Sequence, residues 1–276
     1  MTMKTIQKMA SLLVMLCAMA IGAQAQQRFE LPLWEGSEVT DDAAEARLYV
    51  HLAAEPCGQA IVICPGGGYV GLAIGYEGHD FAPWLNHNGI SVIVLKYRMP
   101  RQRHHIPLAD AEQAMRVVRA HAAEWGIHPN NIGIMGSSAG GHLAATLATH
   151  YGSKETRPDF QVLLYPVITM DKSYTHMGSH DQLVGQDASP ELEQKYSNEK
   201  QVTAETPRAF IVTPAADNIV PVKNTLNYAQ ALIDHKVPCS VHIYPGGFHG
   251  FGSQMSFKDA EIWHQELLRW LQRDGQ

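Results

Sequence analysis

Hydrophobic residues along the chain fall into two kinds of run that alternate. Short, β-branched runs typical of buried strands occupy 47–52, 59–64, 90–95, 132–135, 160–165, 209–212 and 240–244. Between them, apolar residues recur at three- and four-residue steps, as on one helix face, in 81–85, 107–125, 138–150, 226–232 and 263–270. This order predicts an α/β fold: a mostly parallel central sheet, connected by right-handed crossovers, with helices on both faces. Residues 26–46 read as a polar leading segment before the first strand-like run.

Residues 171–206 interrupt this rhythm with a polar, irregular stretch. One interpretation is a small lid-like insertion over a site. The other is a helical crossover carrying solvated charges, because 191–200 has a composition that suits a helix. The sequence leaves both open.

The first residues have the pattern of a cleavable secretory signal. Lys4 and Lys8 precede an apolar stretch from Met9 to Ile21, and Ala23-Gln24-Ala25 follows it. The stretch is too short for a stable bilayer-spanning helix, so no membrane anchor is expected. We therefore predict a signal peptide over 1–25, a single domain over 26–276, and a secreted or periplasmic protein.

Composition narrows the classes of partner. The formal net charge is −6, and removal of the two signal lysines makes it more negative, which disfavours nucleic acid as a partner. The remaining cysteines, Cys57, Cys64 and Cys239, are odd in number and lack metal-like spacing, so we expect mainly inert thiols. The adjacent His104 and His105 lack the helical spacing of a metal site, and no metal or other cofactor is predicted.

The segment Gly136-Ser137-Ser138-Ala139-Gly140 lies between a strand-like run and an Ala-rich helical run. A G-x-S-x-G motif in that setting is a nucleophile elbow, a tight turn that exposes the serine hydroxyl above the sheet. Ser138 is therefore the predicted nucleophile, and an ordinary Gly-Ser turn is the alternative.

A serine hydroxyl needs a base and a carboxylate that orients the base. Asp217 follows the run at 209–212, and His249 follows the last strand-like run, which gives the order serine, acid, histidine. Asp217 could instead serve only as a turn or N-cap residue, and His249 could be structural. His142 follows the elbow and could line the pocket. Five others read as surface or packing residues: His104, His105, His121, His128 and His150.

Two groups of backbone amides could stabilise an oxyanion. Ala139 follows the nucleophile, and the glycine turn after the run at 59–64 presents Gly67 and Gly68. A phosphate-binding loop is the alternative, but the turn lacks both G-x-G-x-x-G spacing and a P-loop lysine.

With these residues in place, the chain resembles the α/β-hydrolase superfamily, and within it the secreted esterases associated with xylan and other acetylated plant polysaccharides. The resemblance covers nearly all of 26–276 and rests on the following segments: Pro65-Gly66-Gly67-Gly68-Tyr69, Leu95-Lys96-Tyr97-Arg98, Glu124-Trp125-Gly126-Ile127, Gly140-Gly141-His142-Leu143-Ala144-Ala145 and Leu164-Tyr165-Pro166-Val167-Ile168.

The resemblance implies hydrolysis of carboxylic esters through an acyl-enzyme, with release of a short acyl group such as acetate from an acylated carbohydrate. It also leads us to expect Tyr69 and His142 among the substrate-binding residues. Related hormone-sensitive-lipase-like esterases carry histidine before the glycines, whereas this chain has Pro65, so a hydrogen bond of that histidine must be absent or replaced. Some relatives are named xylanases, but two opposed carboxylates for glycoside hydrolysis do not stand out.

Two other classes of function use the same features. A prolyl-oligopeptidase-like peptidase or an arylformamidase-like amidase shares the fold and the residue order. An inactive hydrolase-fold protein that only binds carbohydrate would keep the pocket without the chemistry. The sequence does not determine the oligomeric state.

Overall fold

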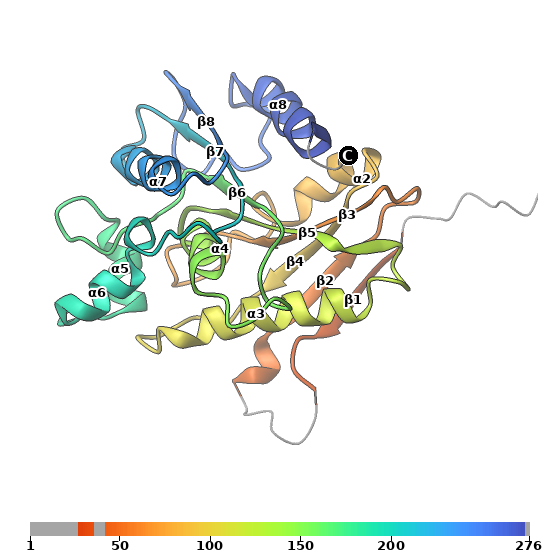
Figure 1. The fold of residues 1–276 in the computed structure, drawn as a ribbon, viewed down its shortest axis with the longest axis horizontal. Helices are drawn as coiled ribbons and strands as arrows, with labels where there is room; N and C mark the ends of the chain where they lie inside the picture. The colour runs from red at the N-terminus through yellow and green to blue at the C-terminus, as the bar shows by residue number, and fades with distance from the viewer. Residues whose placement is uncertain (1–26, 36–41, 274–276) are drawn as a thin grey trace, which may run out of the picture.

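An eight-stranded sheet runs through the described part of the computed structural model, residues 27–35 and 42–273 (Figure 1). The predicted signal peptide lies outside these residues. The strands are β1 (Arg28–Pro32), β2 (Arg47–His51), β3 (Gly58–Cys64), β4 (Ser91–Lys96), β5 (Ile127–Ser137), β6 (Gln161–Leu164), β7 (Ala209–Pro214) and β8 (Cys239–Tyr244), in the order β1-β2-β4-β3-β5-β6-β7-β8. The first two pairings, β1 with β2 and β2 with β4, are antiparallel, and all later ones are parallel.

Helices cover both faces of this sheet. On one face lie α3 (His105–Ala120), α4 (Ser138–His150) and α7 (Lys223–Asp234), and on the other α2 (Ala82–His87) and α8 (Ala260–Arg273). Figure 1 shows α2 and α8 near one another, apart from α3 and α4. The predicted α/β class, with a mostly parallel sheet between helices, is confirmed.

Strand β3 shows how the sequence fills both layers. Ile61 and Ile63 face the cluster with α2 and α8, while Ala60 and Val62 face the cluster with α3, α4 and α7. Alternate residues of a strand point to opposite faces, so a strand covered on both sides must be apolar throughout. Helix α4 is likewise buried nearly all round, and its small alanines let it lie close against the sheet.

The structure differs from the sequence patterns at two places, an edge strand that was not predicted and a helix that ends early. The leading segment contains β1, which pairs with β2 at the sheet edge; its partly exposed residues gave no strong apolar pattern. The helix expected over 107–125 ends at Ala120, and turns follow it. Trp125 still packs in the core, which explains why its spacing resembled a continued helix.

Residues 171–206 carry two short helices, α5 (Met177–Leu183) and α6 (Pro190–Tyr196), and the 3-10 turn η3 (Asn198–Lys200). The helix expected within 191–200 is therefore present. Figure 1 shows α5 and α6 at the margin of the molecule, below α7 in that view. The segment joins β6 to β7 and is called the insertion below.

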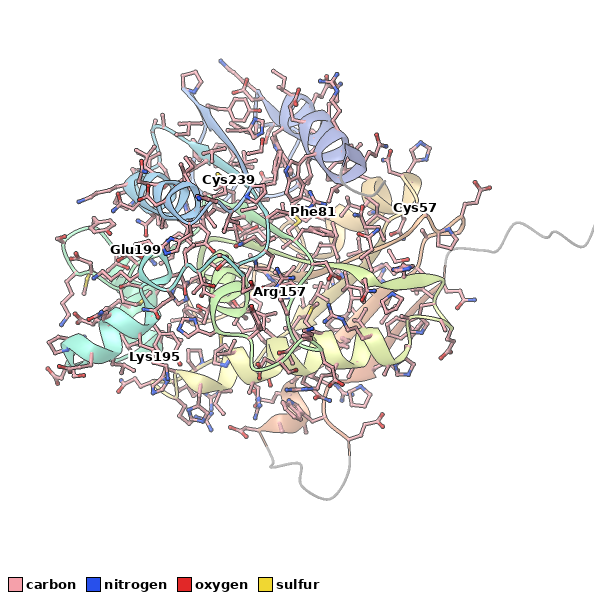
Figure 2. The ribbon with its side chains drawn as sticks, in the orientation of Figure 1. Cys57, Phe81, Arg157, Lys195, Glu199 and Cys239 are labelled. Carbon is pink, nitrogen blue, oxygen red and sulfur yellow. The ribbon has the colours of Figure 1, made fainter. Side chains whose placement is uncertain are left out.

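The three cysteines within the described residues are all free thiols. Cys64 is buried at the end of β3, and burial raises the pKa of its thiol. Cys57 is exposed, and Figure 2 shows it well apart from Cys239. Among the described helices, none combines the length and apolarity needed to cross a bilayer.

Candidate active site

Ser138 is the first residue of α4 and directly follows the end of β5. Its φ of 53° lies in the left-handed region that non-glycine residues rarely adopt, as a nucleophile elbow requires. A Cβ atom on Gly140 would overlap the carbonyl oxygen of Cys64, so a glycine there lets α4 approach the end of β3. This close approach brings the serine beside the glycine turn that follows β3.

Three side chains from separate segments of the chain form one hydrogen-bonded line. His249 Nε2 lies 2.8 Å from Ser138 Oγ, and His249 Nδ1 lies 2.8 Å from Asp217 Oδ2. A carboxylate only accepts, so Nδ1 carries the proton and Nε2 of the neutral ring accepts from the serine hydroxyl. The structure thus brings together the predicted nucleophile, base and acid.

Asp217 also holds its own turn. Its Oδ1 accepts from the N–H groups of Ile219 and Val220, both at 2.9 Å, while Oδ2 faces His249. The side chain is fully buried, whereas that of His249 remains 13% exposed. Asp217 therefore serves both as a turn residue, through Oδ1, and as the residue that orients His249, through Oδ2.

The glycine turn after β3 lies against the elbow. Gly67 has a φ of 133°, and a Cβ there would overlap the carbonyl oxygen of Gly71, so only glycine fits without strain. Within the described residues, the N–H groups of Gly67 and Gly68 have no hydrogen-bond acceptor. Ala139 lies in the first turn of α4, where backbone N–H groups lack partners inside the helix. Ala139 directly follows Ser138, and a Cβ built on Gly66, next to Gly67, would lie 2.9 Å from Ser138 Cβ, so the predicted oxyanion donors lie on the two segments that meet at the serine.

Pro65 leaves the turn without the histidine of related esterases, and two other side chains hold it. The hydroxyl of Tyr97 donates to the Pro65 carbonyl at 2.7 Å. The N–H of Gly66 donates to Glu77 Oε2 at 2.8 Å. These two hydrogen bonds hold the backbone of the turn on either side of the Pro65–Gly66 peptide bond.

The structure encloses Tyr69 and His142, the two residues expected to bind substrate, inside the protein. Both side chains are buried, and the Tyr69 hydroxyl lies 2.9 Å from His142 Nδ1. His142 Nε2 faces the Tyr196 carbonyl oxygen at 2.8 Å, and burial lowers the pKa of His142 to about 4. The pair links the glycine turn to α4 and the insertion.

Three further residues at the site escaped the sequence analysis. Glu77 and Tyr165 lie buried beside the elbow, and His176 approaches from the insertion. Glu77 gave only a weak signal, an acidic residue between Gly75 and Gly78 after the glycine turn. Their proximity depends on contacts between distant segments.

His176 lies against the glycine turn: a Cβ on Gly68 would stand 3.7 Å from its Cε1. Its Nδ1 accepts from the N–H of Ser179, as the N-cap of α5, so the neutral ring carries its proton on Nε2. Burial lowers the pKa of His176, and nearby His249 lowers it further. Within the described residues, Nε2 has no hydrogen-bond partner.

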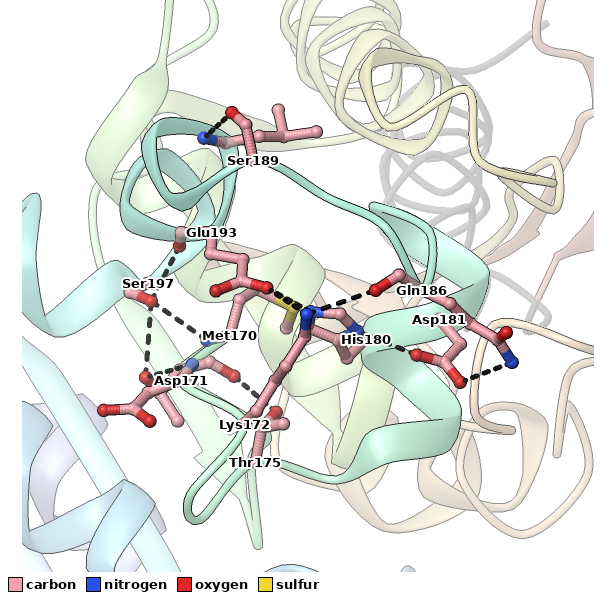
Figure 3. Close-up of polar contacts among 12 residues, drawn as sticks. Met170, Asp171, Lys172, Thr175, His180, Asp181, Gln186, Ser189, Glu193 and Ser197 are labelled. Carbon is pink, nitrogen blue, oxygen red and sulfur yellow. Dashed lines mark hydrogen bonds and ion pairs between the residues drawn. The ribbon is translucent and has the colours of Figure 1, made fainter.

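Polar contacts fix the insertion that presents His176 (Figure 3). The buried His180 ring lies between two carboxylates, with Nε2 3.0 Å from Glu193 Oε1 and Nδ1 2.9 Å from Asp181 Oδ1. Lys172 Nζ adds an ion pair to Glu193 at 2.9 Å. These contacts join α5 to α6.

The described residues contain no group of three or more His, Cys, Asp or Glu side chains placed to hold a metal ion. The chemistry that the geometry offers is nucleophilic attack by a serine with proton transfer through an imidazole.

The sequence of this chain is similar to those of known hydrolases. The model of a family described as alpha/beta hydrolase fold matches residues 61–253, a range that contains Ser138, Asp217 and His249. An acetylxylan esterase of Xylanibacter ruminicola is 39% identical over 262 residues, 94% of this chain and 53% of that protein. A protein of Butyrivibrio fibrisolvens named endo-1,4-beta-xylanase B is 33% identical over 242 residues, 81% of this chain and 38% of its own.

Among solved structures, an acetyl ester-xyloside bifunctional hydrolase from Caldicellulosiruptor lactoaceticus superposes with a TM-score of 0.82 at 35% identity. The match covers 90% of this chain and 96% of that one. The chain spans about half the length of the first of the two curated relatives and less of the second.

Proposed function

The chain belongs to the alpha/beta hydrolase fold family, and on that premise we propose that it is a serine carboxylic ester hydrolase that removes short acyl groups, chiefly acetyl, from plant cell-wall carbohydrate such as xylan. The observation that carries the proposal is the hydrogen-bonded line from Asp217 through His249 to Ser138, beside a turn with unpartnered amides.

In the first half-reaction, Ser138 Oγ attacks the ester carbonyl carbon while His249 Nε2 takes the hydroxyl proton. The carbonyl π electrons move to oxygen, and the amides of Gly67, Gly68 and Ala139 donate to the resulting oxyanion. Asp217 keeps the imidazole in the required tautomer. The intermediate then expels the sugar alkoxide, which receives the proton from His249 and leaves an acyl-serine.

In the second half-reaction, water attacks the acyl-serine carbonyl carbon and gives a proton to His249 Nε2. Collapse of that intermediate breaks the bond to Ser138 Oγ, and His249 returns the proton to the serine. The products are the free enzyme and a carboxylate such as acetate. No cofactor is needed for either half.

The rim of the site supports a carbohydrate substrate. Val70, Tyr76, Met177, Ile219 and Phe248 are exposed apolar residues, each within two positions of a site residue in the sequence. Exposed rings such as those of Tyr76 and Phe248 offer apolar faces to sugar C–H groups. The names of the Xylanibacter ruminicola and Caldicellulosiruptor lactoaceticus proteins point to the same substrate class.

The proposal extends to where the enzyme acts. The pattern in residues 1–25 supports export, which would bring residues 26–276, as one hydrolase domain, to a polymer outside the cytoplasm. Sequencing the N-terminus of protein recovered from the periplasm or medium tests this part. A mature chain that still begins at Met1 would exclude it.

Hydrolysis of an aryl acetate by wild type and Ser138→Ala tests the central claim. We expect the substitution to lower kcat on the order of 10³-fold or more, since the nucleophile is lost. Ser153→Ala is the matched control, because Ser153 is exposed beyond the other end of α4. Unchanged hydrolysis in Ser138→Ala would refute the proposal.

Substrate class is tested by acetate release from acetylated xylan, xylo-oligosaccharides and pectin, with aryl esters of increasing acyl length in parallel. Proline-containing peptides, formylkynurenine and an aryl xyloside test amide and glycoside cleavage. Faster turnover of any of these than of acetyl esters would replace the proposed activity. A fluorophosphonate probe separates an enzyme from a binding protein, because only an activated Ser138 is labelled.

A further inference from the structure

Glu77 is a buried carboxylate next to the proposed catalytic residues. It is 2% exposed, and both of its oxygens accept hydrogen bonds. Oε2 accepts from the N–H of Gly66 at 2.8 Å, and Oε1 accepts from the hydroxyl of Tyr165 at 2.7 Å. A Cβ built on Gly66 would lie 2.5 Å from Glu77 Oε2 and 2.9 Å from Ser138 Cβ, which shows how closely the carboxylate approaches the elbow.

Tyr165 extends this contact to the loop of His249. Its hydroxyl accepts from the N–H of Gly252 at 2.8 Å while it donates to Glu77. Its ring meets the His249 ring edge-on, with centroids 4.9 Å apart. Tyr165 directly follows β6 and is fully buried. One carboxylate therefore ties together the glycine turn, the end of β6 and the loop that carries the base.

The charge of Glu77 has no lysine or arginine partner among the described residues. Burial raises the pKa of Glu77, and the hydrogen bonds from Tyr165 and Gly66 oppose that rise, as does the nearby His249. Two acceptor oxygens facing two donors suit the ionised form. The cation that Glu77 can meet is the imidazolium that forms on His249 during the reaction.

We propose that Glu77 is a positioning residue, which fixes the oxyanion turn and the His249 loop relative to Ser138 and whose negative charge stabilises the protonated His249. The inference rests on the proposed esterase function and assigns a role within that same site. The other titratable groups that face His249 are Asp217 from the loop after β7 and His176 from the insertion, with the Tyr165 ring alongside.

Glu77→Gln tests both parts, because glutamine keeps the volume and loses the charge. We expect kcat for an aryl acetate to fall about tenfold to a hundredfold, because the amides of the glycine turn are displaced from the oxyanion. KM should change little, because these amides stabilise the transition state rather than the bound substrate. We also expect the acid limb of kcat/KM against pH to move to lower pH, because removal of a negative charge makes protonation of His249 less favourable. A purely structural role would leave that limb in place.

Glu112→Gln is the matched control. Glu112 Oε1 also accepts from a backbone N–H, that of Gly152, but beyond the far end of α4. This variant should keep the wild-type kcat and pH profile. Tyr165→Phe removes the hydrogen bond between Tyr165 and Glu77 from the tyrosine side, so kcat should fall in this variant too. The kcat of the Glu77→Gln, Tyr165→Phe double variant should be no lower than that of the less active single variant.

The outcomes separate the two proposals. If wild type neither hydrolyses esters nor reacts with a fluorophosphonate, the esterase function fails. If wild type is active and both Glu77→Gln and Tyr165→Phe keep its kcat and acid limb, the role of Glu77 is refuted while the esterase function stands. Should Glu77→Gln not fold, an unchanged kcat in Tyr165→Phe refutes the positioning role, and a lowered kcat supports it.

Discussion

Ser138 and Gly67 both adopt positive φ angles, and they lie on neighbouring turns that meet at the site. At Ser138 the backbone is strained so that the hydroxyl projects from the elbow. At Gly67 the absence of a side chain lets the turn fold back on Gly71 and leaves its amide free. The site therefore depends on backbone shape as much as on side-chain chemistry.

Gly67→Ala should disrupt the oxyanion turn. Its Cβ would overlap the Gly71 carbonyl oxygen, so the turn must shift and the amides of Gly67 and Gly68 move away from the oxyanion. Loss of one such donor lowers kcat by on the order of 10²- to 10³-fold. Kinetics on an aryl acetate measure this. Gly71→Ala, in the same turn with open space around it, should behave like wild type, and equal activity of both variants would contradict the assignment.

Sequence patterns located Ser138, Asp217 and His249 because each follows a strand-like run, and parallel strands bring such residues to one edge of the sheet. The same patterns did not show that Tyr69 and His142 are buried, since spacing does not reveal whether a polar side chain next to a motif faces the core. Glu77 was missed for a related reason. Its significance comes from Gly66 and Tyr165, and Tyr165 is distant in sequence.

At the scale of elements, the central strands and long helices could be predicted because each has a strong apolar pattern of its own. The edge strand β1 and the helices of the insertion could not be placed with the same precision. Helix α5 has few apolar positions and is held by contacts with α6 that the sequence does not show. Its N-cap, His176, nevertheless faces the glycine turn, so the order of this insertion bears on the site.

Glu193→Gln should loosen α5 from α6. The substitution removes the charge that His180 and Lys172 both meet, and a weakened contact to the buried His180 costs about 1 kcal/mol. We expect faster proteolytic cleavage between α5 and α6 and a higher KM for acetylated xylo-oligosaccharides, measured by limited proteolysis and kinetics. Glu191→Gln, exposed on the same helix, is the matched control. Identical cleavage rates in the two variants would argue against the contact.

At the scale of the whole molecule, the sheet and its two helical layers bury several histidines in neutral form. Burial lowers the pKa of His51, His142 and His264 to about 4 in each case. His142 is the most completely enclosed, with Tyr69 and the Tyr196 carbonyl as its partners. In the unfolded chain the same ring takes up a proton near its ordinary value of 6.5.

This difference predicts that the fold loses stability between pH 6.5 and pH 4. In that window the unfolded chain binds a proton that folded His142 does not, so the free energy of unfolding falls as pH falls, by about 1.4 kcal/mol per pH unit at most for one histidine. Urea unfolding at several pH values measures the slope. His142→Gln should be less stable near pH 7 but should show a shallower slope, whereas His87→Gln, at an exposed position on α2, should keep the wild-type slope. If the free energy of unfolding of His142→Gln depends on pH as steeply as that of wild type, other groups cause the acid sensitivity. The buried contact between Tyr69 and His142 would then contribute nothing to the pH dependence of stability.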